Sequence, residues 1–167
     1  MSNLPKSIIL STKWLGEIPL NWNVKKIKYY TSSEKNKSIN GDEELLSVSE
    51  YKGIVPRSQL TEDDDGMSRA ESLVGYLKVE KGYLVSNIML MWKKGLGVSR
   101  QKGIVSPAYS VFSFLDSNPF YFDYLFRTSL YITEFKKHST GIIDSRLRLY
   151  DDKFRALYTH FPPIEEQ

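Results

Sequence analysis

Two apolar, strand-prone stretches on either side of a basic loop constrain this chain more than any other feature. Residues 83–92 are mostly aliphatic, and residues 104–114 are rich in β-branched and aromatic side chains. Stretches of this length and composition favour buried β-strands. Residues 93–103 between them hold three glycines and four basic side chains, which is typical of a flexible loop. The sequence therefore predicts a β-hairpin with a long cationic tip.

The clearest helix signal follows this hairpin. Asn118 and Pro119 suit the N-cap and the first position of a helix. Apolar residues then recur near helical spacing as far as Phe135. The residues after this stripe are basic and suit the negative end of the helix dipole, Lys136-Lys137-His138. We therefore expect one helix over 119–138.

Weaker patterns predict short elements elsewhere. Ser68 and Glu71 have capping-box spacing, which indicates the start of a helix. Turn-forming residues mark the connections. In chain order we expect a strand or short helix over 22–30, a polar loop over 31–42, a strand over 45–49, a polar connection over 53–65, a helix over 68–76, an extended piece at 146–148, and a helical turn to Tyr158 capped by Asp151 or Asp152.

Length and composition set the broad class. A chain of 167 residues is long enough to bury a core of its own. We expect a polar lead-in segment over 1–13 and a single domain over 14–167. The chain has no cysteine, which excludes disulfides and thiolate metal sites. Its apolar runs are too short to span a bilayer, and its start lacks the pattern of a secretory signal.

The distribution of charge is more informative than the net charge of +3. No Asp or Glu occurs from Lys81 to Leu115, whereas acidic residues gather at 42–44 and 62–65. A surface with one positive face attracts a phosphate backbone. The same lysines could also be scattered, solvated residues without a ligand.

Patterns expected of a catalytic centre are missing or incomplete. Gly95-Leu96-Gly97 lacks the third glycine of a nucleotide-binding fingerprint, and no P-loop occurs. Ser106–Tyr109 and Asn118–Phe120 match the Asn/Asp-Pro-Pro-Tyr/Phe motif of amino-methylating enzymes only in part. The acidic run 62–65 consists of consecutive loop residues, which do not converge on one metal ion. We expect no catalytic, metal-binding or cofactor-binding residues, and we interpret His138 and His160 as structural.

A binding surface is the remaining interpretation. Arg and Gln side chains match guanine and adenine edges in the major groove, and lysines attract phosphates. The candidate DNA-binding residues lie in the loop before residue 104 and after the long helix: Lys93, Lys94, Ser99, Arg100, Gln101, Lys102, Lys136, Lys137, Arg146 and Arg148. Arg146 and Arg148 also alternate with leucines, so they could simply belong to a half-exposed strand paired with Asp144 or Asp151.

A series of motifs carries a family resemblance. The N-terminal motif is Trp14-Leu15-Gly16-Glu17-Ile18-Pro19 with Trp22 and Lys25-Lys26-Ile27-Lys28. It is followed in order by Tyr51–Arg57, Lys81–Asn87, Gly97-Val98 with Gly103–Tyr109, Arg146–Leu149 and Phe161–Gln167. This order resembles the target recognition domains of type I restriction-modification specificity (S) subunits, from about Trp14 to Gln167.

The resemblance implies a fold and a role. It implies an α+β domain, a twisted mixed β-sheet with flanking helices, that recognises one half of a bipartite double-stranded DNA target in the prokaryotic cytoplasm. Such a domain is not itself an enzyme. Adenine methylation with S-adenosylmethionine belongs to the methyltransferase (M) subunits, and ATP- and Mg-dependent cleavage belongs to the restriction (R) subunit; a second specificity domain is a further possible partner. The sequence departs from the pattern because the spacer helix that follows Phe161–Gln167 in the family is absent.

Within this resemblance, base readout is expected in the segments between the motifs, at 31–44, 57–75, 93–103 and 136–146. Trp14 and Trp22 are expected to pack in the core or against another domain rather than to stack on DNA, and Trp22→Ala, as a core truncation, should cost a few kcal/mol. Two other roles remain open: the recognition portion of a DNA adenine methyltransferase, and a protein-interaction module without a DNA role.

Overall fold

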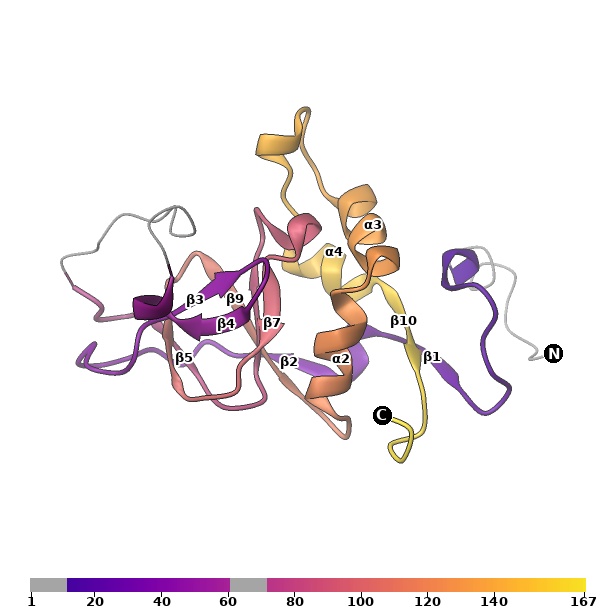
Figure 1. The fold of residues 1–167 in the computed structure, drawn as a ribbon, viewed down its shortest axis with the longest axis horizontal. Coiled ribbons are helices and arrows are strands. Elements are labelled where there is room, and N and C mark those ends of the chain that lie inside the picture. The colour runs from indigo at the N-terminus through magenta and orange to yellow at the C-terminus, as the bar shows by residue number, and fades with distance from the viewer. Residues whose placement is uncertain (1–11, 61–71) are drawn as a thin grey trace.

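The computed structural model describes residues 12–60 and 72–167 (Figure 1). Its strands are β1 (Asn23–Lys26), β2 (Thr31–Ser33), β3 (Leu46–Ser49), β4 (Gly53–Pro56), β5 (Leu77–Val79), β6 (Leu84–Asn87), β7 (Leu96–Val98), β8 (Gly103–Val105), β9 (Tyr109–Phe114) and β10 (Tyr158–Phe161). Its α-helices are α2 (Pro119–Phe126), α3 (Ser129–His138) and α4 (Asp151–Ala156). Short 3-10 helices are η1 (Lys13–Leu15), η2 (Ile27–Tyr29), η3 (Arg57–Gln59), η4 (Met91–Lys93) and η5 (Asp144–Arg146).

The expected α+β class is confirmed, with strands β3, β4 and β5 gathered on one side and the helices on the other (Figure 1). A four-stranded sheet has the order β2-β9-β6-β7, and two-stranded pairs join β1 to β10, β3 to β4 and β5 to β8. These pairs are all antiparallel. Among the described residues a parallel link occurs as the isolated bridge Leu45–Ile104.

The two strands of the expected hairpin are confirmed, but the prediction of one long loop over 93–103 is wrong. β6 and β9 pair antiparallel, with Leu84 opposite Phe112. The segment between them is not one loop, because it contains β7, which pairs with β6, and the start of β8, which pairs with β5. Its glycines mark close packing: a Cβ at Gly103 would lie 2.4 Å from the Glu44 carbonyl oxygen.

Strands β6 and β9 separate two apolar clusters. Leu84 and Phe112 point into the larger cluster with the helices, and Val85 and Val111 point into a cluster with β3, β4, β5 and β8. Successive side chains of a strand face opposite sides of a sheet, so both faces of this pair are covered. This explains why residues 83–92 and 104–114 lack a simple apolar–polar alternation.

The expected long helix is two helices. Its start is as predicted, since Asn118 Oδ1 accepts a hydrogen bond from the Phe120 amide at 3.0 Å. The chain leaves the helix at Arg127 and Thr128, and α3 starts at Ser129. The Thr128 hydroxyl donates to the Leu125 carbonyl at 2.8 Å, a local bond that competes with helical continuation.

Several weaker expectations need correction. The expected loops over 31–42 and 53–65 begin with β2 and β4, which gain their partners from β9 and β3. Residues 72–76 of the expected 68–76 helix are not helical, and residues 61–71, including the acidic run, lie outside the described residues, as does most of the lead-in segment. α4 follows Tyr150 and has no side-chain cap, and the expected exit after it is β10.

The N-terminal motif and the C-terminal motif meet in space. β1 pairs with β10, and the Trp22 indole Nε1 donates to Glu166 Oε2 at 2.7 Å. The Trp14 ring lies edge-on to Tyr131 at 5.0 Å. Trp14 packs against the larger apolar cluster, but Trp22 is half-buried and lies outside it. The expectation of a core role for Trp22 is therefore wrong, because its ring joins two chain segments near the surface.

Candidate nucleic-acid interface

The sequence-predicted basic residues of 93–103 lie at the two ends of β7, the edge strand of the four-stranded sheet, and the others lie on or after α3. Lys93 and Lys94 precede the strand, and Arg100 and Lys102 follow it. At about 3.3 Å per residue, Lys94 and Arg100 are separated by at most about 20 Å along the chain. Both groups therefore lie within about two strand lengths of each other, one at each end of β7.

The first group surrounds Trp92. The ammonium groups of Lys93 and Lys136 each lie 4.9 Å from the centre of the Trp92 ring, so α3 and η4 bring residues far apart in sequence together. Lys136 also pairs with Asp144 at 2.8 Å, and Lys137 pairs with Glu134 at 3.5 Å. The lysines themselves are exposed, as is Arg146 on η5.

The second group surrounds the start of α2. The Arg100 guanidinium lies 4.8 Å from the centre of the Phe120 ring, which fixes its direction. Gln101 is exposed beside it. Lys102 pairs with Glu80 at 3.0 Å, with both side chains largely in solvent. Exposed pairs of this kind contribute little, so Lys102 can exchange Glu80 for another anion.

Two candidate residues have structural roles instead. Ser99 is 0% exposed and its hydroxyl donates to the Gln101 carbonyl at 2.6 Å, so its side chain does not reach the surface. Arg148 is half-buried, its Nη1 donates to the Leu147 carbonyl at 2.9 Å, and its backbone pairs with Thr140. The sequence placed both in exposed segments because it does not reveal which loop residues turn inward.

A hollow beside β7 contains residues that the sequence analysis did not select. It is lined by Arg100 and Gln101 together with the β3–β4 turn and α2: Tyr51, Lys52, Gly53, Ile54, Val55, Pro56, Gln59, Val98, Asp123 and Arg127. Tyr51 is 86% exposed at the turn. Residues 51–56 lie outside the segments in which base readout was expected, because they belong to a motif of the family resemblance.

Arg127 and Asp123 hold this hollow together. Arg127 Nη1 donates to the carbonyls of Lys94 at 3.1 Å and Leu96 at 2.7 Å. Its Nη2 donates to the Glu50 carbonyl at 2.5 Å. Asp123 Oδ1 accepts from the Val98 amide at 2.9 Å. α2 thereby fixes the free edge of β7 and the β3–β4 turn relative to each other.

We call the exposed basic side chains along this edge the cationic strip. Its members are Lys52, Lys93, Lys94, Arg100, Lys102 and Lys136. The strip combines ammonium groups with the guanidinium of Arg100, the amide of Gln101 and the phenol of Tyr51. Such a surface can attract phosphates and offer planar hydrogen-bonding groups to base edges.

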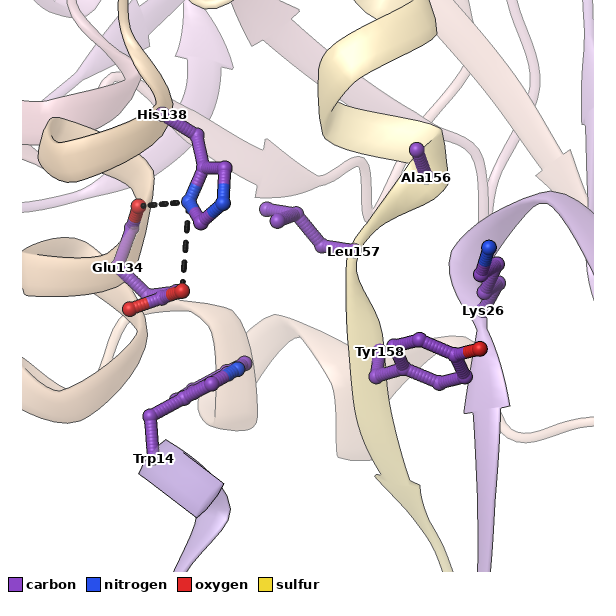
Figure 2. A pocket seen from close by; sticks show the side chains of 7 residues that line it. All are labelled: Trp14, Lys26, Glu134, His138, Ala156, Leu157 and Tyr158. Atoms are coloured by element: carbon purple, nitrogen blue, oxygen red, sulfur yellow. Dashed lines mark hydrogen bonds and ion pairs between the residues drawn. The ribbon is translucent and has the colours of Figure 1, made fainter. Parts of the chain in front are cut away.

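A second pocket lies between α3, η1 and β10 (Figure 2). Its carboxylate, Glu134, is 5% exposed and lies 3.3 Å from His138 Nδ1. His138 Nδ1 also lies 3.1 Å from the Glu134 carbonyl oxygen, and the Lys26 ammonium lies over the Tyr158 ring. The charged groups shown in Figure 2 therefore contact neighbours within the protein, in keeping with the expected structural role of His138.

Both ring nitrogens of His160 also have hydrogen-bond partners. Nε2 lies 3.0 Å from the Leu15 carbonyl, to which it must donate, so Nδ1 accepts from the Tyr131 hydroxyl at 2.9 Å. The Tyr131 oxygen in turn accepts from the His160 amide at 3.0 Å. This arrangement needs a neutral ring, and burial lowers the pKa of His160 below its ordinary value.

We expect the protein to lose stability on mild acidification through His160. The unfolded chain takes up a proton at this residue near pH 6.5, whereas the folded chain does so only at lower pH. The contribution is therefore present above about pH 6.5, and it is lost as pH falls through that value towards the folded pKa. Thermal melting between pH 7.5 and 5.5 measures it. His160→Gln should have a flatter profile, and an unchanged profile in this variant would remove His160 as the cause.

Residues 12–60 and 72–167 contain no group of three or more His, Cys, Asp or Glu side chains placed to hold a metal ion. In the same ranges, no helix combines the length and apolar character needed to cross a membrane.

Comparison with known proteins identifies the fold. No protein-family model matches the sequence, and no curated protein matches it. Among solved structures, the HsdS subunit from Thermoanaerobacter tengcongensis aligns with 90% of this chain at a TM-score of 0.60 and 13% identity. A chain from a structure describing complex assembly and conformational transition of the type I R-M system aligns with 90% at a TM-score of 0.62 and 14% identity. This chain has their fold and spans 40% of the length of each.

Proposed function

We propose that this chain recognises double-stranded DNA as a target recognition domain of a type I restriction-modification specificity subunit. The cationic strip carries the proposal, because it places basic and planar side chains on one edge of a fold shared with an HsdS subunit. The series of sequence motifs supports it independently of that alignment. The bound DNA sequence would be one half of a bipartite target.

Different side chains of the strip would have different tasks. Lys93 and Lys136 lie over the Trp92 ring, and exposed Lys94 follows Lys93 in the chain; none of these three lysines lines the hollow, which suits contact with phosphates. Arg100 and Gln101 line the hollow beside Tyr51, where a base edge can meet planar donors and acceptors. Arg100 is held over Phe120, and a side chain with a fixed direction loses less freedom on binding.

In this proposal the domain selects the sequence and does no chemistry itself. Partner M subunits would bind S-adenosylmethionine and methylate adenine, and an R subunit would use ATP and Mg to restrict unmodified DNA. A second recognition domain would read the other half of the target. The assembly would act in the cytoplasm of a prokaryote.

Salt-dependent binding tests the proposal. The 167-residue chain is titrated into a fluorescein-labelled 30-base-pair duplex pool of random sequence at several salt concentrations, with enrichment of bound duplexes to test for sequence preference. We expect Arg100→Ala/Lys102→Ala to weaken binding and to reduce the slope of log K against log salt by about 1, because Lys102 would contact a phosphate whereas Arg100 would meet a base edge.

Lys28→Ala/Lys153→Ala is the matched control, since both lysines are exposed, lie on η2 and α4, and are not members of the cationic strip. This variant has the same loss of charge and should retain most of the slope. Equal effects of the two double variants would remove the strip as the interface. Absence of binding at low salt would contradict the function itself.

A further inference from the structure

Residues 139–148 form a loop that leaves α3, passes through η5 and returns towards α4. This loop stands out from the body of the molecule (Figure 1). Two backbone hydrogen bonds close its base, from the Thr140 amide to the Arg148 carbonyl at 2.8 Å and from the Arg148 amide to the Thr140 carbonyl at 2.9 Å. A Cβ at Gly141 would lie 2.6 Å from the Arg146 carbonyl oxygen, so the two sides of the loop approach closely. The loop is thus a paired, two-segment projection.

The tip of this projection is apolar. Ile142 is 99% exposed and Ile143 is 53% exposed. Internal hydrogen bonds shape the tip, from the Arg146 amide to the Ile143 carbonyl at 2.9 Å and from the Leu147 amide to the Asp144 carbonyl at 3.1 Å. A ligand that covered these two adjacent isoleucines would remove their apolar surface from water, which is favourable.

Positive charge surrounds the projection. Lys136 pairs with Asp144 in the loop and also lies over Trp92 of η4, which connects the base of the loop to the Lys93 end of the cationic strip. Lys137 is exposed on α3 just before the projection, and Arg146 is exposed within it. An apolar tip within a cationic border fits a polyanion that also presents apolar groups.

We propose that Ile142 and Ile143 enter the major groove of the duplex and contact thymine methyl groups, while the flanking cations hold the phosphates on each side. This rests on the proposed function and adds apolar base contacts to it. The major groove is favoured because it admits a two-stranded ribbon, which a two-segment loop approximates, whereas the minor groove is only about 6 Å wide. Thymine methyl groups are the apolar feature of that groove.

The test is Ile142→Ser/Ile143→Ser, measured on a duplex enriched by the wild-type chain from a random pool. We expect about a 10-fold loss of affinity, because contact with thymine methyl groups would bury only part of each isoleucine. The slope of log K against log salt should stay unchanged, because no charge is removed. The same duplex with uracil in place of thymine should weaken the wild type and leave the variant nearly unaffected.

Leu20→Ser/Ile164→Ser is the matched control, since both of these aliphatic side chains are exposed outside the segments expected to read bases, and melting temperatures verify folding of each variant. The inference would be overturned if the loop variant bound the duplex as tightly as the control variant does. It would also be overturned if uracil weakened binding of the variant as much as binding of the wild type. In both cases the proposed function would stand. A wild-type chain that binds no duplex at low salt would instead contradict the proposed function.

Discussion

Truncation of Phe122 to alanine should lower the free energy of unfolding by about 3–5 kcal/mol. Phe122 is fully buried on α2, and its ring stacks on Tyr30 at 4.6 Å and packs against Phe126 at 5.6 Å. It also contacts Phe161 of β10 at 5.9 Å. These partners belong to different segments that cannot easily collapse into the space left by the ring, so the cost includes a cavity as well as lost burial.

Urea denaturation with a constant m-value measures this loss. Tyr124→Ala is the control on the same helix, because Tyr124 is 71% exposed and should change stability by no more than about 0.5 kcal/mol. A similar, small effect of both substitutions would show that the aromatic cluster around Phe122 repacks freely. A large loss of unfolding free energy at Phe122 and a small one at Tyr124 would show that packing between the helices and β10 is a main source of stability.

The sequence predicted elements whose signals are local. The Asn118 cap depends on an amide only two residues away, and the N-terminus of α2 lies where Asn118 and Pro119 indicate. The strand at Leu46–Ser49 and the pairing of β6 with β9 follow from composition and from neighbouring turns. The α+β class and the motif order of the resemblance were also accessible without coordinates.

Elements defined by distant partners could not be predicted. The short strands β2 and β4 carry polar residues and become strands only through β9 and β3. Gly97 and Gly103 resemble loop glycines, yet backbone and side chains of β3 and β4 pack against them. In a single sequence, a glycine needed for close approach cannot be distinguished from one needed for flexibility.

In the candidate site, too, features with a local signal could be predicted and features that depend on other contacts could not. Charge pattern alone selected Lys93, Arg100 and Lys136, which are exposed on the cationic strip. It could not show that Ser99 turns inward, since that depends on its bond to the Gln101 carbonyl. The charge pattern also gave no reason to select Arg127. This residue lies among apolar residues of the expected helix, and its hydrogen-bond partners are 31 to 77 residues away.

Replacement of Arg127 by alanine should have the second-largest effect, a loss of about 2–4 kcal/mol in unfolding free energy. The guanidinium donates to the carbonyls of Lys94, Leu96 and Glu50, and charged hydrogen bonds of this kind are stronger than neutral ones. Removal leaves three carbonyls without this donor. Arg127→Lys should recover only part of the loss, because one ammonium group cannot match the planar fork that reaches two chain segments.

The same substitution should weaken DNA binding although Arg127 itself is not expected to contact DNA. It joins the carbonyls of Lys94 and Leu96, where the chain enters β7, to the Glu50 carbonyl of the turn with Tyr51, so its loss releases these two sides of the hollow from each other. Arg146→Ala provides the contrast, since this exposed arginine should reduce binding with little change in stability. Paired urea denaturation and DNA titrations separate the two roles. If Arg127→Ala kept full stability and lost binding only as Arg146→Ala does, Arg127 would be a surface cation rather than the connection between α2, β7 and the β3–β4 turn.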